Sequence, residues 1–301
     1  MTLTDPAQPL RDFVPRKKFF IGIDSDGCVF DSMEIKQKEC FTPMFIKHFH
    51  LQAASKYARQ TWEFVNLYSK NRGCNRFHAL AFTLGLLRRR PEVLARQVAI
   101  FDGAPLEQWT ARESKLSEST LAAEIKAGHQ ELAPLMDWSK AVNAAVADIV
   151  HGVPPFPLVR ECLEKLAPEA DALVISQTPG DALRREWAEH DLEKYVRLIA
   201  GQEMGSKSEH LKFAAVDKYP RENILMIGDA PGDHKAAKAN SVLFFPIVPH
   251  HEEDSWKELF EHGLDRFFAG TFAGEYEKRL FAEFDASLPA TPPWKEVAVS
   301  S

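Results

Sequence analysis

The chain is poor in cysteine and has no long apolar stretch, and each absence excludes a class of protein. Its four cysteines are scattered and show neither a CxxC pair nor the spacing of a metal finger. We therefore expect reduced thiols and a cytoplasmic location. No stretch is long and apolar enough to span a membrane, and residues 1–18 lack the apolar segment of a signal peptide. We expect a soluble protein with no membrane partner.

Positive charge is not in excess either. Lys and Arg number 37 against 43 Asp and Glu, which gives a net charge of −6 at pH 7. A nucleic-acid partner would favour a basic face, so we expect none. The 301 residues, 45% of them hydrophobic, are enough for two globular domains of ordinary size. The sequence has no internal repeat and does not indicate an oligomeric state.

The most informative stretch is Phe19–Ser32, FFIGIDSDGCVFDS. The apolar run Phe19–Ile23 is too short for a helix and is typical of a buried strand. It ends in Asp24 and Asp26, and a strand buried on both faces belongs to a parallel sheet, whose chemistry lies at the carboxyl ends of its strands. Two carboxylates this close would repel each other unless a cation or a phosphoryl group engages them. The alternative is a turn, because Asp-Gly is common in turns and Asp24 could cap the segment after it.

Short apolar runs alternate with helical patterns beyond residue 157. This alternation predicts an α/β fold with a doubly wound parallel sheet. The strands that we expect are Phe19–Ile23, Ala172–Ile175, Leu198–Ala200, Ile224–Ile227 and Val242–Val248.

A long helical insert separates the first strand from the others. Apolar residues keep helical spacing through residues 32–150, and the proline-rich stretch His151–Pro157, HGVPPFP, is the clearest linker in the chain. We therefore expect a discontinuous α/β core over 16–31 and 151–250, with an all-helical domain over 32–150. Amphipathic helices over 251–284 would pack on the core, and the prolines of 285–301 indicate a loose tail.

The predicted strands end in residues suited to phosphoryl transfer, and parallel strands would bring these ends to one edge of the sheet. The residues are Asp24, Asp26, Ser176, Asp229 and Asp233. Lys207 follows the third strand, at the start of a helix that Ser206 and Glu209 open with the spacing of a capping box. A lysine at a helix start is unfavourable to the helix dipole, which favours a functional role.

In this strand context, the DSDG of Asp24–Gly27, Ser176, Lys207 and Gly228-Asp229 with Asp233 resemble the motifs of the haloacid dehalogenase superfamily of hydrolases. The chain looks phosphoglycolate phosphatase-like, and its insert lies where that superfamily carries a helical type-one cap. The resemblance implies a Rossmann-like core and a phosphatase that hydrolyses a small phosphorylated metabolite.

The resemblance also implies catalytic roles, which the chemistry of the residues supports. Asp24 would be the nucleophile that forms an aspartyl-phosphate. Asp26 would protonate the leaving alkoxide and then take a proton from the attacking water. Ser176 would donate a hydrogen bond to a phosphoryl oxygen, and Lys207 would stabilise the phosphoryl oxygens and Asp24.

The same resemblance implies a Mg²⁺ cofactor. Asp229 would join Asp24 and the Asp26 carbonyl in holding the ion, because Mg²⁺ prefers oxygen ligands and offsets the repulsion among the carboxylates. Asp233 would support the ion directly or through water, and it could also act as a helix cap.

A basic loop in the insert is the candidate for substrate recognition. The stretch KNRGCNR over Lys70–Arg76 breaks two helical stripes, and Arg72 and Arg76 can each bind a carboxylate or phosphate through two hydrogen bonds. With Asn75 they would bind an acidic phosphorylated substrate. The alternative is a solvated surface loop.

Two further functions remain open from the sequence. A phosphomutase would use the same nucleophile and acid, and a catalytically idle binding module would keep the fold without the reaction. The complete acidic set favours the phosphatase, because a fold kept only for binding has no need of clustered carboxylates. Dehalogenases and phosphonatases of the superfamily lack an aspartate at the position of Asp26, so we expect neither.

Overall fold

The computed structural model of the chain describes residues 5–297, which form two compact units. The first unit comprises the described residues up to Ser32 together with Gly152–Ser287. The second comprises Met33–His151 with the described residues from Leu288 onward. The chain therefore passes from one unit to the other after residues 32, 151 and 287. The first two crossings lie within a residue of the ends of the predicted insert, 32–150.

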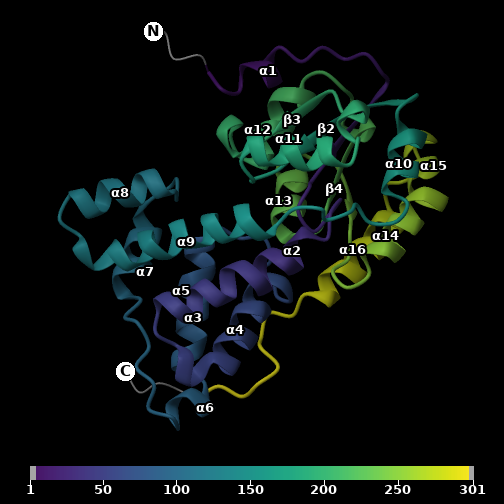
Figure 1. Ribbon diagram of the computed structural model, residues 1–301. Helices are drawn as coiled ribbons and strands as arrows, with labels where there is room; N and C mark the ends of the chain where they lie inside the picture. Colours follow the sequence, from purple (N-terminus) through teal and green to yellow (C-terminus); the bar gives the residue numbers. More distant parts are fainter. Residues whose placement is uncertain (1–4, 298–301) are drawn as a thin grey trace. The chain divides into compact units, whose positions relative to one another are not determined.

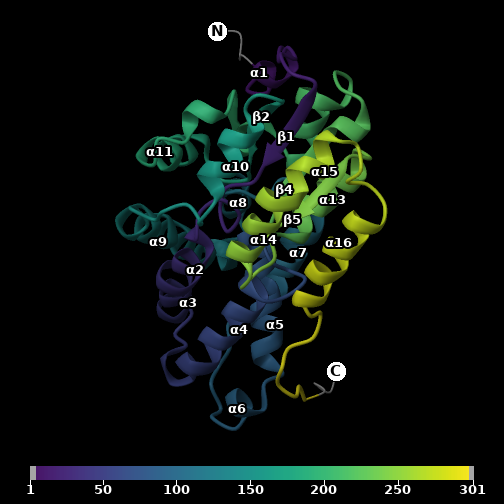
Figure 2. The same ribbon diagram turned by 90° about the vertical axis from the view of Figure 1, so that its right-hand side faces the viewer.

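The first unit contains a parallel sheet of five strands in the order β3-β2-β1-β4-β5 (Figures 1 and 2). Each strand lies where the sequence predicts one, with small shifts at the ends. The predicted fold class is thereby confirmed. The bounds are β1 Phe19–Ile23, β2 Ala170–Ile175, β3 Leu198–Ala200, β4 Ile224–Gly228 and β5 Leu243–Pro246.

Helices cover both faces of this sheet because β1 is apolar on both sides. Phe19, Ile21 and Ile23 pack in a core with residues of four helices, among them Leu163, Trp187, Trp256 and Leu264. On the opposite face Phe20 contacts Tyr219, and Leu211 lies so near Gly22 that an added Cβ would come within 3.3 Å of it. The sheet is therefore doubly wound, with its strand ends free to carry the site.

The helices of the first unit are α1 Gln8–Arg11, α10 Val159–Leu166, α11 Gly180–Glu189, α12 Lys207–Leu211, α13 Pro231–Ala239, α14 Glu252–Glu258, α15 Leu264–Phe268 and α16 Glu275–Ser287. Short π-helical segments extend α12 over Lys212–Val216 and join α14 to α15 over Leu259–Gly263. Trp256, Leu264 and Leu280 belong to the core of this unit, so α14–α16 complete it.

The second unit is helical, and residues 33–151 contain no strand. Its core is unusually aromatic: the ring of Trp62 lies 5.7 Å from that of Trp138 and 5.9 Å from that of Phe41. Its helices are α2 Ser32–Ile35 (which starts on the last residue of the first unit), α3 Thr42–His48, α4 Ser55–Leu67, α5 Arg76–Arg88, α6 Pro91–Leu94, α7 Ala104–Arg112, α8 Glu118–Lys126 and α9 Ala133–Ile149. None of the described helices in either unit has both the length and the apolar character that crossing a membrane requires.

The end of the chain differs from the loose tail that the sequence predicts over 285–301. Helix α16 continues to Ser287, and from Leu288 the described residues pack on the second unit. The ring of Trp294 lies 4.2 Å from the guanidinium carbon of Arg90 and 5.4 Å from the ring of Phe64. The described part of this segment is therefore held by aromatic and cation–π contacts, which its prolines do not prevent.

Candidate active site

The site is built at the carboxyl edge of the sheet. Asp24 directly follows β1, and its N–H donates to the carbonyl of Ile227 in β4 at 3.0 Å. Asp229 directly follows β4, and Ser176 directly follows β2. Because these strands are parallel neighbours, the residues after them share one edge, as expected from the sequence.

A tight turn after β1 fixes Asp24 and Asp26 relative to each other. Gly27 has a φ of 74°, a conformation that glycine adopts without strain, and its N–H donates to the carbonyl of Phe30 at 2.8 Å. The carbonyl of Ser25 accepts from the N–H of Val29 at 2.9 Å. The aspartates therefore lie on a hydrogen-bonded turn rather than on a free loop.

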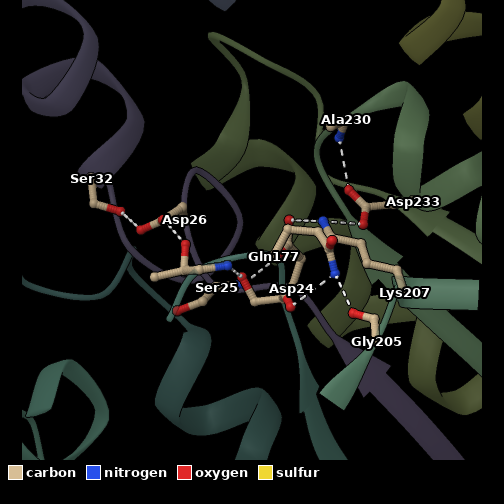
Figure 3. A network of polar contacts seen from close by, with 11 residues as sticks. Asp24, Ser25, Asp26, Ser32, Gln177, Gly205, Lys207, Ala230 and Asp233 are labelled. Carbon is tan, nitrogen blue, oxygen red and sulfur yellow. Dashed lines mark hydrogen bonds and ion pairs between the residues drawn. The ribbon is translucent and has the colours of Figure 1, made fainter. Parts of the chain in front are cut away.

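Three carboxylates and one lysine form the centre of the site. Asp24, Asp229 and Asp233 each offer an oxygen within 4.8 Å of the others, and all three residues are buried. The Lys207 Nζ lies 2.6 Å from Asp24 Oδ2 and 2.6 Å from Asp233 Oδ1. Figure 3 shows the ammonium group between the two carboxylates. The contact between Lys207 and Asp24 joins residues 183 positions apart in the sequence.

The charges of this cluster shift the pKa of its members. Burial alone would lower the pKa of Lys207, but the charges of Asp233 and Asp24 outweigh it and raise that pKa well above the usual range. Burial raises the pKa of Asp233 above its usual range, and the charge of Asp24 adds to this against the opposing effect of Lys207. Lys207 therefore carries a permanent positive charge at neutral pH.

Local structure explains why Lys207 and Asp233 reach the cluster. The predicted capping box is present, since Ser206 Oγ accepts from the N–H of Glu209, whose carboxylate accepts from the N–H of Ser206. This cap places Lys207 in the first turn of α12. Asp233 lies in the first turn of α13 and accepts from the N–H of Ala230 at 3.1 Å, so it is also a helix cap, the alternative that the sequence leaves open.

Gly228 permits the approach of Asp233. A Cβ on Gly228 would lie 2.3 Å from Asp233 Cγ, which is closer than real atoms approach. Any other residue at this position would push the Asp233 carboxylate away from Lys207. Close packing at the end of β4 thus requires a glycine at position 228.

Asp26 has a different environment from the other carboxylates. Its Oδ1 accepts from the hydroxyl of Ser32 at 2.6 Å, and its Oδ2 accepts from the hydroxyl of Thr178 at 2.7 Å. Figure 3 shows Asp26 turned toward Ser32, whereas Asp24 points toward Lys207. Neither Thr178 nor the hydroxyl of Ser32 was singled out from the sequence. The sequence did contain one signal for Thr178, which lies two residues after Ser176 at the end of the same strand.

The loop after β2 is held from several directions. Ser176 is buried, its N–H donates to Ala200 at 3.0 Å, and its Oγ accepts from the N–H of Thr178 at 3.3 Å. Gln177 Nε2 donates to the carbonyl of Gly205 at 3.0 Å, which joins this loop to the loop before Lys207. A hydroxyl that accepts one hydrogen bond can still donate its own proton, so the Ser176 side chain can serve as a donor.

The three insert residues predicted to bind substrate have partners inside the second unit. Asn75 is the N-cap of α5 and accepts from the N–H of Phe77 at 3.0 Å. Arg76 donates to Ser139 and Asn143 at 3.0 and 2.8 Å, and burial lowers its pKa against the charge of Glu118.

Arg72 is only 3% exposed and donates to the carbonyl of Leu67, the last residue of α4, at 3.1 Å. Each of the three side chains therefore has a structural task. Their role in substrate binding stays a prediction.

The cluster fits a small, hard cation. Its donors are carboxylate oxygens, which Mg²⁺ prefers to nitrogen or sulfur ligands. Three carboxylates share a buried space in which Lys207 contacts two of them, so a divalent cation would reduce their mutual repulsion. Asp24 accepts from the N–H of Ser25 and from Lys207, and Asp233 accepts from Lys207 and the N–H of Ala230, so a bound cation would share these oxygens with their present donors.

No family model matches the sequence, and no curated protein matches it. Solved structures with some likeness include a haloacid dehalogenase-like hydrolase from Streptococcus pneumoniae, 13% identical over 79% of this chain and 90% of its own, with a TM-score of 0.43. A haloacid dehalogenase-like hydrolase from Xanthomonas campestris is 12% identical over 78% of this chain and 85% of its own, with a TM-score of 0.42. A chain described as a predicted phosphoglycolate phosphatase from Haemophilus somnus is 14% identical over 82% of this chain and 99% of its own, with a TM-score of 0.44. At identities and TM-scores this low, the likeness does not assign an activity to this chain.

Proposed function

We propose that the chain is a Mg²⁺-dependent phosphomonoester hydrolase of the haloacid dehalogenase superfamily. It would act in a reducing cytoplasm on a small phosphorylated metabolite, through an aspartyl-phosphate at Asp24. The observation that carries the proposal is the buried cluster of Asp24, Asp229 and Asp233 around Lys207 at the carboxyl edge of the sheet. The four cysteines, all present as free thiols, suit a reducing compartment.

The metal would be held by Asp24, Asp229 and the carbonyl of Asp26, with Asp233 supporting it through water. When bound, it supplies positive charge beside the phosphoryl oxygens. In this assignment Asp233 also keeps Lys207 in place, because its Oδ1 accepts from Lys207 Nζ at 2.6 Å.

The protein's own residues would then carry out two displacements at phosphorus. The Asp24 carboxylate attacks, the bond between phosphorus and the ester oxygen breaks, and Asp26 gives its proton to that oxygen. Water then attacks the phosphoryl group on Asp24, Asp26 takes its proton, and phosphate leaves. Lys207 and the Ser176 hydroxyl would stabilise the negative charge on the phosphoryl oxygens through both steps.

A screen for phosphate release tests this function. The full chain is incubated with Mg²⁺, p-nitrophenyl phosphate and a panel of phosphorylated metabolites, and inorganic phosphate is measured. We expect release from p-nitrophenyl phosphate and faster release from one class of metabolite, and none after Asp24→Asn. A protein that needs a bisphosphate activator and releases little phosphate is a mutase. One that binds phosphorylated ligands but turns over none is a binding module.

A further inference from the structure

We propose that Ser32 and Thr178 form a hydroxyl clamp that positions the Asp26 carboxyl for proton transfer. The inference rests on the proposed function, in which Asp26 is the acid and base, and it adds two positioning residues to the reaction. Its basis is the pair of contacts described above, one to each carboxylate oxygen, at 2.6 and 2.7 Å. Two hydrogen bonds to two different oxygens fix both the place and the rotation of a carboxyl group.

Thr178 can hold Asp26 because its own backbone is fixed. Its carbonyl accepts from the N–H of Gln202 at 3.1 Å, and its N–H donates to Ser176 Oγ at 3.3 Å. Pro179 follows directly and restricts the backbone before α11. The hydroxyl of Thr178 is therefore presented from a rigid strand-to-helix connection.

Ser32 holds the other oxygen from a separate element. It is fully buried, and it is the first residue of α2, just after the turn that carries Asp26. Because Ser32 and Thr178 lie on different segments, the Asp26 carboxyl is held from two sides. Loss of one hydroxyl would remove one of these two contacts and weaken the positioning of the Asp26 carboxyl.

The chemistry of the partners suits a group that changes protonation state. A hydroxyl can donate or accept, so it can stay bonded to a carboxyl that has either lost or gained a proton. The Ser32 and Thr178 hydroxyls therefore suit a residue that gives and takes a proton.

The clamp predicts a dependence on the leaving group. An alkoxide leaves poorly without a proton, whereas p-nitrophenolate is a weak base that leaves without one. The ratio kcat/KM covers the steps up to departure of the leaving group, so it excludes the later attack of water. The experiment measures kcat/KM for glycerol 2-phosphate and for p-nitrophenyl phosphate with the wild type, Ser32→Ala, Thr178→Val and Asp26→Asn.

We expect each hydroxyl deletion to lower kcat/KM for glycerol 2-phosphate by roughly 10- to 100-fold, since a misplaced catalytic group can cost about 10²-fold. The value for p-nitrophenyl phosphate should change by less than about 3-fold, because proton donation contributes little to that reaction. The double variant should approach Asp26→Asn, and Thr178→Ser and Ser32→Thr should recover most of the activity. Thr83→Val removes a buried hydroxyl of the second unit and should leave kcat/KM unchanged for both esters.

Equal losses with both substrates, or no loss, would overturn the clamp, because a general distortion of the site does not depend on the leaving group. A selective loss that Thr178→Ser does not recover would overturn the assignment to the hydroxyl. If the wild type releases phosphate from neither ester, the proposed function fails and the clamp fails with it. If the wild type is active and Asp26→Asn shows no dependence on the leaving group, only the clamp and the role of Asp26 fail.

Discussion

The two ends of the same sheet carry buried aspartates in opposite situations. At the amino end, Asp171 in β2 is 1% exposed and accepts from the N–H groups of Arg16 and Lys17 at 2.7 and 2.9 Å. It also accepts from the Tyr219 hydroxyl at 2.6 Å and from Arg197 at 2.8 Å. At the carboxyl end, three buried carboxylates gather around the single lysine that two of them contact.

The difference contrasts a carboxylate that the fold holds with carboxylates for which we propose a catalytic function. Asp171 has four donors, two of them backbone groups, so the folded chain itself neutralises and orients it. The cluster at the other end brings three carboxylates together around one lysine, so an added cation would reduce their mutual repulsion. Burial alone therefore does not distinguish a catalytic aspartate from a structural one, and we expect the clustering of carboxylates to do so.

The largest expected effect is the loss of turnover in Asp24→Asn. An amide at this position cannot form the acyl-phosphate, so phosphate release should fall below detection. Asp171→Asn serves as the matched change at the other end of the sheet and should keep its catalytic rate while folded. Phosphate assays at a temperature where both variants are folded, checked by circular dichroism, make the comparison. Near-normal turnover in Asp24→Asn would remove the distinction between the two ends.

Metal removal sharpens the same distinction. EDTA should abolish activity and Mg²⁺ should restore it, because the carboxylates of the cluster would hold the ion. Ca²⁺ should support little activity, since it accepts more ligands and can engage both oxygens of Asp24. The unfolding midpoint should rise with Mg²⁺ in the wild type and in Asp171→Asn but much less in Asp229→Asn. Full activity after dialysis against EDTA would contradict the metal assignment.

The contribution of Asp171 to the free energy of unfolding should depend on pH. Burial alone would raise the pKa of Asp171, but the hydrogen bonds from Tyr219, Arg16 and Arg197 outweigh it and lower that pKa below its usual range. Because this pKa is lower in the folded state than in the unfolded state, ionised Asp171 stabilises the fold at pH values above its unfolded pKa of about 3.9. This stabilisation is lost as the pH falls through the pKa of Asp171 in the folded state.

Asp171→Asn should therefore cost about 2–3 kcal/mol at pH 7, and the cost should shrink below about pH 4. Urea unfolding of the wild type and of Asp171→Asn between pH 7 and pH 3 measures this difference in the free energy of unfolding. A cost that stays constant over this range would show that the charge of Asp171 is not what matters.

The smallest expected effects concern the arginines of the second unit. Arg72→Ala should lower the free energy of unfolding by about 1–3 kcal/mol, since the buried carbonyl of Leu67 loses its donor. The sequence-based hypothesis adds a second effect for Arg72→Ala and Arg76→Ala, a higher KM for the natural substrate with p-nitrophenyl phosphate unaffected. Lower stability with unchanged KM would place both residues with Asp171 as structural groups. A higher KM would show that residues with partners in the fold can also recognise substrate.

The sheet and most residues of the carboxylate cluster could be predicted from the sequence, because the carboxyl ends of parallel strands lie at one edge of a sheet. Once Phe19–Ile23 and Ile224–Ile227 are taken as strands of one sheet, Asp24 and Asp229 must emerge at one edge. Lys207 could be placed because its capping box is local. Hydrogen-bond partners across loops were not predictable, since the contact of Thr178 with Asp26 depends on the path of two turns 152 residues apart. The packing of Trp294 on Arg90 was missed for a similar reason, because the prolines around it indicated only the absence of regular structure.

Formation of an aspartyl-phosphate at Asp24 itself tests the central claim most directly. In Asp26→Asn, p-nitrophenyl phosphate should still phosphorylate the enzyme, while the attack of water is slowed by about 10²–10⁴-fold. Rapid mixing should therefore give a burst of about one p-nitrophenolate per protein, since the phosphorylated enzyme accumulates. Borohydride reduction of the quenched protein should convert Asp24 alone to homoserine, as peptide mass spectrometry would show. Steady release without a burst, with Asp24 unmodified in a variant that still turns over, would contradict the account.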